Sequence, residues 1–529
     1  MNTPSTPSST TQVGAPGLRQ IEITPAQLIY LEGILAIFIA TGSLTWPLGG
    51  DHSFFYFVGN SILHGGVPYR DAWELKGPLT YYLCAAILAV FGRHEISIRV
   101  FDLMAIGLFC WWLNRTAVCV EGRLTPGATF MVVLFCLQFL CIGLACTAQP
   151  DEWGGFLIAV AVTLLLESSW SPTSTMVAIG ILVAMATLLK PTFLIFLPLP
   201  LLYPPCTRRG WMSSLKLRGV CVLACAATIT LALGIIFRNG GFEDYLDLLY
   251  FLPSSYFPFS QRHLMDEARL LPLDLWELGL TIPYVLAFPA IGLIRHNGYK
   301  RLARILSTWF ALGILLVLAQ GTYWPYTFIP ATIAAAVILG NCLSLFGRET
   351  VTPFVRNLAT GFAVLVIGVP VVASHYLSDT LFGSLAWPPY VLGVLPKPDY
   401  MLRVANGYPG SLDRVAAYID SHSNDEDTIF LWCWDIRVLA IGRRQSASRF
   451  GTFEALITQG PLQAKYRQLF MGDITRRPPR YIVVDYLEST YRPESSLWLL
   501  KDFTEFNRFL QEHYRLETQI GQYELWVKT

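Results

Sequence analysis

Charged residues are scarce in this sequence. Asp, Glu, Lys and Arg make up 14% of its 529 residues, whereas soluble domains carry roughly 25%. Hydrophobic residues account for 53% of the chain, and the mean hydropathy is +0.46. This composition excludes an ordinary soluble domain and indicates a polytopic α-helical membrane protein.

Several other signals are missing. The net charge of +1 gives no electrostatic reason to expect a nucleic-acid partner. Neither a Cys-x-x-Cys pair nor a His-rich ligand spacing occurs, so we expect no metal site and no cofactor. A divalent metal ion is compatible with the sequence but is not implied by it. The 11 cysteines lie mostly inside apolar runs, as small buried hydrophobic residues do.

The chain contains instead a series of long apolar runs. A helix needs about 20 apolar residues to cross a bilayer; about eleven runs are candidates for this, although several of them are shorter. Prolines interrupt the stretch 154–203, which predicts broken helices there. Residues 1–25 begin with a Ser-, Thr- and Pro-rich segment, and we expect a disordered N-terminus. The predicted spans are 26–46, 96–113, 126–146, 154–168, 174–189, 191–203, 217–237, 275–294, 305–320, 324–346 and 355–376.

One short apolar run decides the orientation of every later span. The run 78–92 has about 15 residues, fewer than a crossing usually needs. If it lies in the membrane interface, all basic clusters between the spans fall on one side, which the positive-inside rule places in the cytoplasm. We therefore predict an interfacial helix at 78–92 in a multi-pass protein of the plasma or inner membrane. The N-terminus is then cytoplasmic and the C-terminus lies outside.

The last 130 or so residues have a different pattern. Helical and strand-like segments alternate there, which predicts a small extracytoplasmic α/β domain. The expected helices are 411–422, 461–471 and 499–513, and the expected strands are 429–434 and 481–485. The predicted organisation is a membrane domain (26–376, with a first outer loop at 47–95), a linker (377–398) and the α/β domain (399–529).

The first outer loop places a carboxylate and two cations at one edge of the membrane. Asp51 precedes a stretch with helical spacing, so it is either a helix N-cap or a general base for an acceptor hydroxyl. Lys76 is either an interfacial lysine that extends to headgroups or a contact for a lipid phosphate. With Arg70, these residues suggest an enzyme that moves a group from a phospholipid carrier to an acceptor.

Other candidate residues lie on the same predicted face. Asp151 is either the N-cap of the following span or a second acid. Lys190 lies at the outer end of a span, where it either reaches the headgroups or serves the site. Tyr256 belongs to an aromatic and polar loop that suits a sugar or a headgroup. Tyr323 and Tyr326 fit either an interfacial aromatic belt or a sugar-stacking surface.

The order of these features is similar to that of a known family. An acid follows the first span, a short amphipathic helix ends in Gly-Gly-Val-Pro-Tyr (65–69), and Lys-x-Pro-x-x-Tyr-Tyr (76–82) leads into the interfacial run. A later span is preceded by Gln-Pro-Asp (149–151). This arrangement resembles the GT-C membrane glycosyltransferases, and it is closest to the bacterial branch that resembles protein O-mannosyltransferases and lipid A aminoarabinose transferases. The resemblance covers roughly residues 26–350.

The resemblance implies a GT-C fold and an inverting transfer of a sugar from a polyprenyl-phosphate donor on the extracytoplasmic face. The acceptor would be a lipid, a glycan or a protein. His52 and Pro325 stand where the family often has Glu and His, so no paired-acid role at 51–52 and no donor contact from that histidine is expected. The resemblance implies Asp51 as base, Asp151 as the matching second-loop acid, Lys76 at the donor phosphate and Lys190 in the same cavity. To these we add, as our own predictions, Arg70 at the donor phosphate and Glu74, Tyr81, Tyr256, Tyr323 and Tyr326 at the substrates.

Three rival functions remain at this stage. A transporter or lipid flippase would place charges within the spans and often has internal repeats, but no repeat is evident here. A polymerase or ligase of lipid-linked saccharides would be expected to carry its key charges in one large late loop. A non-catalytic scaffold would not require Asp51 at all.

Overall fold

A computed structural model provides the structure of this protein. It describes residues 42–115, 146–166, 169–205, 211–256, 275–321, 323–346, 385–404, 410–486 and 496–529, together with a few single positions between these ranges. The predicted spans 26–46, 126–146 and 355–376 lie largely outside the described residues, as do the N-terminal segment and part of the linker.

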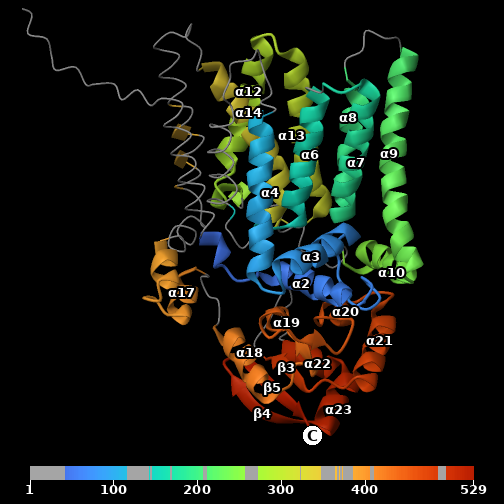
Figure 1. The fold of residues 1–529 in the computed structure, drawn as a ribbon, viewed down its shortest axis with the longest axis vertical. Helices are drawn as coiled ribbons and strands as arrows, with labels where there is room; N and C mark the ends of the chain where they lie inside the picture. The colour runs from blue at the N-terminus through green and yellow to red at the C-terminus, as the bar shows by residue number, and fades with distance from the viewer. Residues whose placement is uncertain are drawn as a thin grey trace, which may run out of the picture.

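A bundle of long helices forms one end of the molecule (Figure 1). Four of the described helical segments are long and apolar enough to cross a membrane: Pro172–Leu189, Met212–Arg238, Lys300–Gln320 and Pro325–Leu343. The helices of the bundle are α4 (Ile96–Arg115), α6 (Pro150–Leu166), α7 (Pro172–Leu189), α8 (Pro198–Leu202), α9 (Trp211–Arg238), α12 (Thr281–His296), α13 (Lys300–Gln320) and α14 (Ile329–Phe346).

The broken helix predicted for 154–203 is present. Helix α7 ends at Leu189, and a 3₁₀ segment, η3 (Pro191–Phe196), separates it from α8. Proline lacks an N–H group and its ring clashes with the preceding turn, so Pro191 and Pro198 each start a new element. The break brings Lys190 to the junction in an extended conformation, with φ −151° and ψ 120°.

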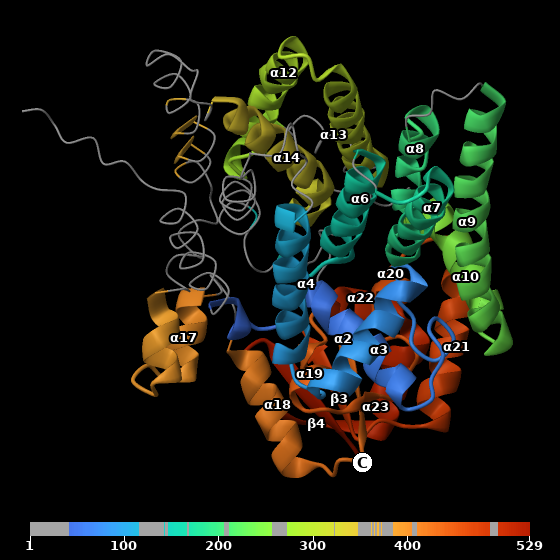
Figure 2. The same cartoon turned by 45° about the horizontal axis from the view of Figure 1, so that its top comes forward.

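Two short helices of the first loop cross the ends of this bundle. Helices α2 (Gly50–Leu63) and α3 (Pro78–Phe91) lie crosswise to α4, α6 and α7, on the side where the C-terminal part of the chain begins (Figures 1 and 2). This direction agrees with the prediction that the run 78–92 does not cross the membrane. Gly65, with φ 85°, follows the end of α2 in the left-handed conformation that glycine adopts at little cost.

The prediction that α2 is amphipathic, with one apolar face, is wrong. Every residue from His52 to Asn60 is buried, including polar Ser53 and Asn60. The reason is that α2 packs against α3 and also against α19 (Arg437–Ile441) of the C-terminal part. A helix covered on several sides buries polar residues along with apolar ones.

The C-terminal residues, hereafter the tail domain (410–529), form the small α/β unit that the pattern predicts. Its five strands are ordered β2-β1-β3-β5-β4; β1 pairs in parallel with β2 and β3, whereas β5 is antiparallel to β3 and β4. The elements are α18 (Ser411–His422), β1 (Thr428–Trp432), α19, β2 (Gln445–Ser446), α20 (Glu454–Ile457), α21 (Gln463–Arg476), β3 (Tyr481–Asp485), α22 (Ser496–Asp502), α23 (Thr504–His513), β4 (Tyr514–Ile520) and β5 (Tyr523–Lys528). A separate short helix, α17 (Lys397–Val404), precedes them.

An aromatic residue of the first loop anchors the tail domain. The backbone N–H of Trp73 donates to the Arg449 carbonyl at 2.7 Å. The Trp73 ring lies 5.9 Å from Phe450 and 5.7 Å from Tyr466 between centroids. The ring also lies 5.4 Å from that of Phe251 between centroids. Aromatic pairs of this kind contribute about 0.5–1.5 kcal/mol each beyond burial, so the loop, α10 (Phe242–Phe251) and the tail domain share one core.

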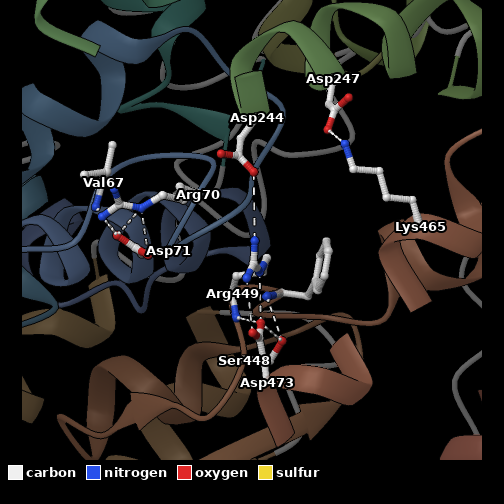
Figure 3. A network of polar contacts seen from close by, with 10 residues as sticks. Val67, Arg70, Asp71, Asp244, Asp247, Ser448, Arg449, Lys465 and Asp473 are labelled. Carbon is white, nitrogen blue, oxygen red and sulfur yellow. Dashed lines mark hydrogen bonds and ion pairs between the residues drawn. The ribbon is translucent and has the colours of Figure 1, made fainter. Parts of the chain in front are cut away.

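Ion pairs also join α10 to the tail domain (Figure 3). Arg449 pairs with Asp473 at 3.0 Å inside the tail domain and with Asp244 of α10 at 3.9 Å. Lys465 of α21 pairs with Asp247 of α10. These contacts fix the tail domain across the end of the bundle, over the loop that carries the candidate site.

The predicted orientation in the membrane can be tested by cysteine labelling at the two ends of the molecule. The turn between α12 and α13 and the tail domain lie at opposite ends of the molecule (Figure 1). Asn297 in that turn and Ser421 in the tail domain are both exposed. In a cysteine-free background, Ser421→Cys should react with an impermeant maleimide in intact cells. Asn297→Cys should react only after the membrane is opened, and its labelling in intact cells would reverse the predicted orientation.

Candidate functional site

The first loop meets the broken end of α7 through a very close backbone approach. The Gly77 N–H donates to the Leu189 carbonyl at 3.0 Å, and the Thr80 hydroxyl donates to the same carbonyl at 2.9 Å. A Cβ atom on Gly77 would lie 2.2 Å from the Leu188 carbonyl oxygen, so only glycine fits. This contact holds Lys76 and Lys190 on adjoining segments.

An ion pair joins the two first-loop residues singled out from the sequence. The Lys76 Nζ atom lies 3.6 Å from Asp51 Oδ2, and the two side chains are 13% and 17% exposed. Asp51 Oδ2 is buried and accepts no hydrogen bond within the described part of the chain. Lys76 Nζ also lies 6.0 Å from the centre of the Phe55 ring, at the edge of the range of a cation–π contact. We call this the open pair, because its contact is long and one carboxylate oxygen lacks a donor.

The backbone of Lys76 is held by three side chains. Buried Glu74 accepts from the Lys76 N–H at 2.9 Å through Oε2 and also accepts from the Tyr81 hydroxyl. The Tyr69 hydroxyl donates to the Lys76 carbonyl at 3.0 Å. The point from which the Lys76 side chain extends is therefore fixed.

The charge of Lys76 is stabilised by its neighbours. Burial on its own would lower the pKa of Lys76, but the carboxylates of Asp51 and Glu74 outweigh burial, and Asp151 adds to their effect. The pKa is raised as a result, and the group is an ammonium ion at every physiological pH.

A second ion pair lies near the first and is closed. Lys190 Nζ donates to both carboxylate oxygens of Asp151, at 3.0 and 2.8 Å, and to Gln320 Oε1 at 2.6 Å. Gln320 Nε2 completes the ring of contacts by donating to Asp151 Oδ1 at 3.1 Å. The Tyr326 ring centre is 5.5 Å from Lys190 Nζ. Asp151 is fully buried, so we call this the closed pair.

Several sequence-based interpretations need correction. Neither Asp51 nor Asp151 is an N-cap: α2 has Gly49 at that position and α6 begins at Pro150, so both acids lie inside a first helical turn. There they lie at the positive end of the helix dipole, where an acidic side chain stabilises the helix.

The cation Arg70 has other partners. Its guanidinium donates to Asp71, 2.6 Å away at the closest, and to the Asn239 carbonyl at 2.9 Å. The adjacent carboxylate already neutralises Arg70 (Figure 3), and the structure gives no support for a phosphate-binding role.

Of the four tyrosine candidates, Tyr81 and Tyr323 have structural contacts, whereas Tyr256 and Tyr326 lie near the ion pairs. Tyr81 is fully buried and serves Glu74, so it supports the site from behind and does not meet a substrate as expected. Tyr323 packs against Phe328.

Tyr256 is the last residue of η4 (Leu252–Tyr256). Burial and nearby carboxylates raise the pKa of its hydroxyl, and the charge of Lys76 opposes this shift. Tyr256 and Tyr326 therefore adjoin the open and the closed pair, respectively.

The sequence reasoning missed Glu454 of the tail domain. Glu454 starts the short helix α20, and burial, with repulsion from Glu74 and Asp51, raises its pKa to about 8, although Lys76 opposes the shift. The tail domain thus contributes a carboxyl group to the surroundings of the open pair. The only available signal was an acid within the apolar run Phe450–Ile457.

The histidine after Asp51 is structural. His52 is fully buried; its Nε2 contacts the Thr147 carbonyl at 2.7 Å and its Nδ1 accepts from the Gly49 N–H at 3.1 Å. Burial, with the Arg99 charge as a second cause, lowers the pKa of His52 to about 3. The neutral ring ties the start of α2 to the segment before α6. This explains how a histidine takes the place of the acid often found there in the resembling family.

Comparison with solved structures bears on the fold. The chain is similar to ArnT, the lipid A aminoarabinose transferase from Cupriavidus metallidurans, bound to undecaprenyl phosphate, with a TM-score of 0.62 at 13% identity over 96% of this chain and 99% of the other. For ArnT in the apo state the TM-score is 0.57 at 16% identity over 95% and 98% of the two chains. The Archaeoglobus fulgidus oligosaccharyltransferase is more distant, with a TM-score of 0.49 at 12% identity over 96% and 74%.

The GT-C resemblance is confirmed at the level of the fold. No family model matches the sequence, and no curated protein matches it either. Among the described residues, no group of three or more His, Cys, Asp and Glu side chains is arranged to hold a metal ion.

The close approach at Gly77 gives the first prediction for this site. Gly77→Ala forces the loop away from the end of α7, and overpacking of this kind costs about 1–3 kcal/mol. The melting temperature of the purified protein should fall. Gly107→Ala is the matched control, because a Cβ there meets nothing within 4 Å and alanine is the better helix former. Equal melting temperatures for the two variants would refute the close approach.

The buried histidine predicts a pH dependence. Folded His52 stays neutral down to about pH 3, whereas an unfolded histidine binds a proton below about pH 6.5. The unfolded state therefore binds more protons, and stability is lost as the pH falls below about 6.5. At pH 5 the loss is about 2 kcal/mol. The melting temperature should fall more steeply between pH 7.5 and 5 in the native protein than in His52→Gln; parallel curves would contradict the buried neutral ring.

Proposed function

We propose that this protein is a membrane glycosyltransferase that moves a sugar from a polyprenyl-phosphate donor to an acceptor hydroxyl on the extracytoplasmic face. The observation that carries the proposal is the contrast between the open pair, Asp51–Lys76, and the closed pair, Asp151–Lys190. One pair has a carboxylate oxygen without a donor and a long contact; the other has every contact made. Only the open pair is poised to exchange its partner for a substrate.

Lys76 is the proposed partner of the donor phosphate. The neighbouring carboxylates keep it charged, and its backbone is fixed by Glu74, Tyr81 and Tyr69. A preorganised cation stabilises the negative charge that develops on a leaving phosphate. Lys190 is close enough to interact electrostatically with Lys76 and Asp51. The closed pair therefore supplies a second cation, fixed by its own contacts, near the first.

Asp51 is the proposed general base. When the phosphate takes over Lys76, the Asp51 carboxylate is released to accept a hydrogen bond from the acceptor hydroxyl. The acceptor oxygen forms a bond to the anomeric carbon while the bond from that carbon to the phosphate oxygen breaks. The electron pair leaves with the polyprenyl phosphate, and the hydroxyl proton passes to Asp51. A direct displacement of this kind inverts the anomeric centre and needs no cofactor.

The remaining candidates have supporting roles in this proposal. Asp151 holds Lys190 and is not itself the base, because both of its oxygens are bound. Tyr256 and Tyr326 flank the two pairs and are the aromatic groups best placed to meet a sugar. Glu454 brings the tail domain to the site and, with its pKa near 8, holds its proton in most molecules at pH 7.

The rival functions fit less well. A transporter or flippase needs charges along its spans, whereas the two described pairs lie where the first loop meets the ends of the helices. The ArnT structure that shares this fold was determined with undecaprenyl phosphate bound, which supports a lipid-linked donor here. The acceptor is a lipid, a glycan or a protein.

The role of Asp51 is tested by Asp51→Asn. Asparagine keeps the size of the side chain and Glu74 remains beside Lys76, so expression and melting temperature should stay near native. A general base contributes about 10²–10⁴-fold to the rate, and the turnover rate should fall by that factor with little change in donor affinity. The control is Asp502→Asn, which alters a surface pair with Arg467 in the tail domain and should leave turnover unchanged. Full activity in Asp51→Asn would exclude it as the base.

Lys76→Gln tests the phosphate contact. A hydrogen bond to a charged group contributes about 1.5–3 kcal/mol, which corresponds to roughly 10- to 150-fold in affinity. The KM for the lipid-linked donor, and the Kd for undecaprenyl phosphate, should rise by this factor. Lys397→Gln, at an exposed pair with Asp413, serves as the control. An unchanged donor KM would show that Lys76 does not bind the phosphate.

A further inference from the structure

A polar pocket lies between the first loop and the tail domain, separate from the two ion pairs. It has a volume of about 200 Å³, and both parts of the chain line it. Tyr56, Phe57, Asn60 and Ser61 of α2 form one wall, and Arg444 and Ser446 of the tail domain belong to the other. We call it the seam pocket.

Two buried polar atoms at the seam pocket lack partners within the described part of the chain. They are Asn60 Oδ1 and Arg444 Nε, and their residues are only 5% and 4% exposed. A buried polar group without a hydrogen bond costs about 1–3 kcal/mol, so such groups usually meet water or a ligand. One of these atoms accepts a hydrogen bond and the other donates one.

The walls favour a neutral ligand rich in hydroxyl groups. Arg444 is already paired with Asp420 at 3.3 Å and with Asp425 at 2.7 Å, and Asp71 with Arg70. A second lining arginine, Arg477, is exposed and donates to Gln445 Oε1 at 3.3 Å. The buried part of the pocket therefore offers mainly an amide, serine hydroxyls and the aromatic surfaces of α2. A sugar hydroxyl can both donate to Asn60 Oδ1 and accept from Arg444 Nε.

The pocket is large enough for a ligand of sugar size. Its volume of about 200 Å³ is well above the roughly 10–15 Å³ that one water needs. One sugar ring with its hydroxyls fits such a space.

The position of the pocket separates it from the reaction. Asn60 lies nine residues after Asp51 in α2, which corresponds to about 13 Å along the helix and to its opposite face. A sugar bound there is not the one that reacts.

We propose that the seam pocket binds one neutral sugar unit and so recruits a glycan acceptor to the protein. The recruiting role rests on the proposed transferase function, but the binding itself does not. Binding energy from a part of the substrate that does not react is used to hold the reacting part in place. The proposal therefore selects a glycan among the acceptor classes.

Binding is tested without any transfer reaction. The full chain in nanodiscs is examined by saturation-transfer NMR with free glucose, galactose, mannose and N-acetylglucosamine, each in turn, and separately with inorganic phosphate. At least one sugar should show a signal that falls at least fivefold in Asn60→Leu, which keeps the volume but removes the amide. Ser446→Trp, which fills the pocket from the tail side, should have the same effect.

The controls separate this proposal from its alternatives. Asn341→Leu removes another buried asparagine, in α14, and should keep the sugar signal, as should Asp51→Asn. Loss of turnover in Asp51→Asn with no sugar signal in the native protein would keep the transferase and overturn the seam pocket. A sugar signal that Asn60→Leu and Ser446→Trp leave intact, or a phosphate signal in place of a sugar signal, would also overturn it.

Discussion

The candidate site depends on the close contact between Gly77 and the end of α7. A backbone hydrogen bond of 3.0 Å joins Gly77 to the Leu189 carbonyl, next to the proline that breaks the helix. The break exposes a carbonyl group that an unbroken helix would use internally, and the glycine lets the first loop reach it. Lys76 precedes this contact and Lys190 follows it, so one backbone interaction brings two cations from distant parts of the sequence together.

The two cations then differ because of their surroundings. Lys190 is enclosed by Asp151 and Gln320 within the bundle, and nothing is left for a substrate to replace without breaking three contacts. Lys76 sits outside the bundle in a loop whose backbone is fixed by Glu74 and Tyr81 while its ammonium group makes one long contact. The tail domain covers this loop through Trp73 and the ion pairs of Arg449, which accounts for the low exposure of a site that lies outside the spans.

Much of this arrangement could be predicted from the sequence, and the rest has identifiable reasons for being missed. Helix 411–422 and strand 481–485 were placed correctly, because hydrophobic periodicity is a local property. The crosswise direction of α3 agrees with the interfacial helix predicted at 78–92. The spacing of the first loop placed Asp51 and Lys76 at one edge of the membrane but did not predict that they form an ion pair. The N-cap interpretation of Asp51 was wrong by two positions, since a Gly-Gly pair can start a helix without a side-chain cap.

Other features depended on contacts that no local pattern contains. Glu454 reaches the site only because the tail domain folds back onto the first loop, and Arg70 is neutralised by the residue beside it. The central claim, that the Asp51–Lys76 pair opens to a lipid phosphate, is tested most directly by a structure of the full chain with undecaprenyl phosphate. The account predicts a phosphate oxygen at hydrogen-bond distance from Lys76 Nζ, about 2.7–3.2 Å, with Asp51 released toward the acceptor side. A phosphate bound elsewhere, with the Asp51–Lys76 contact unchanged, would contradict it.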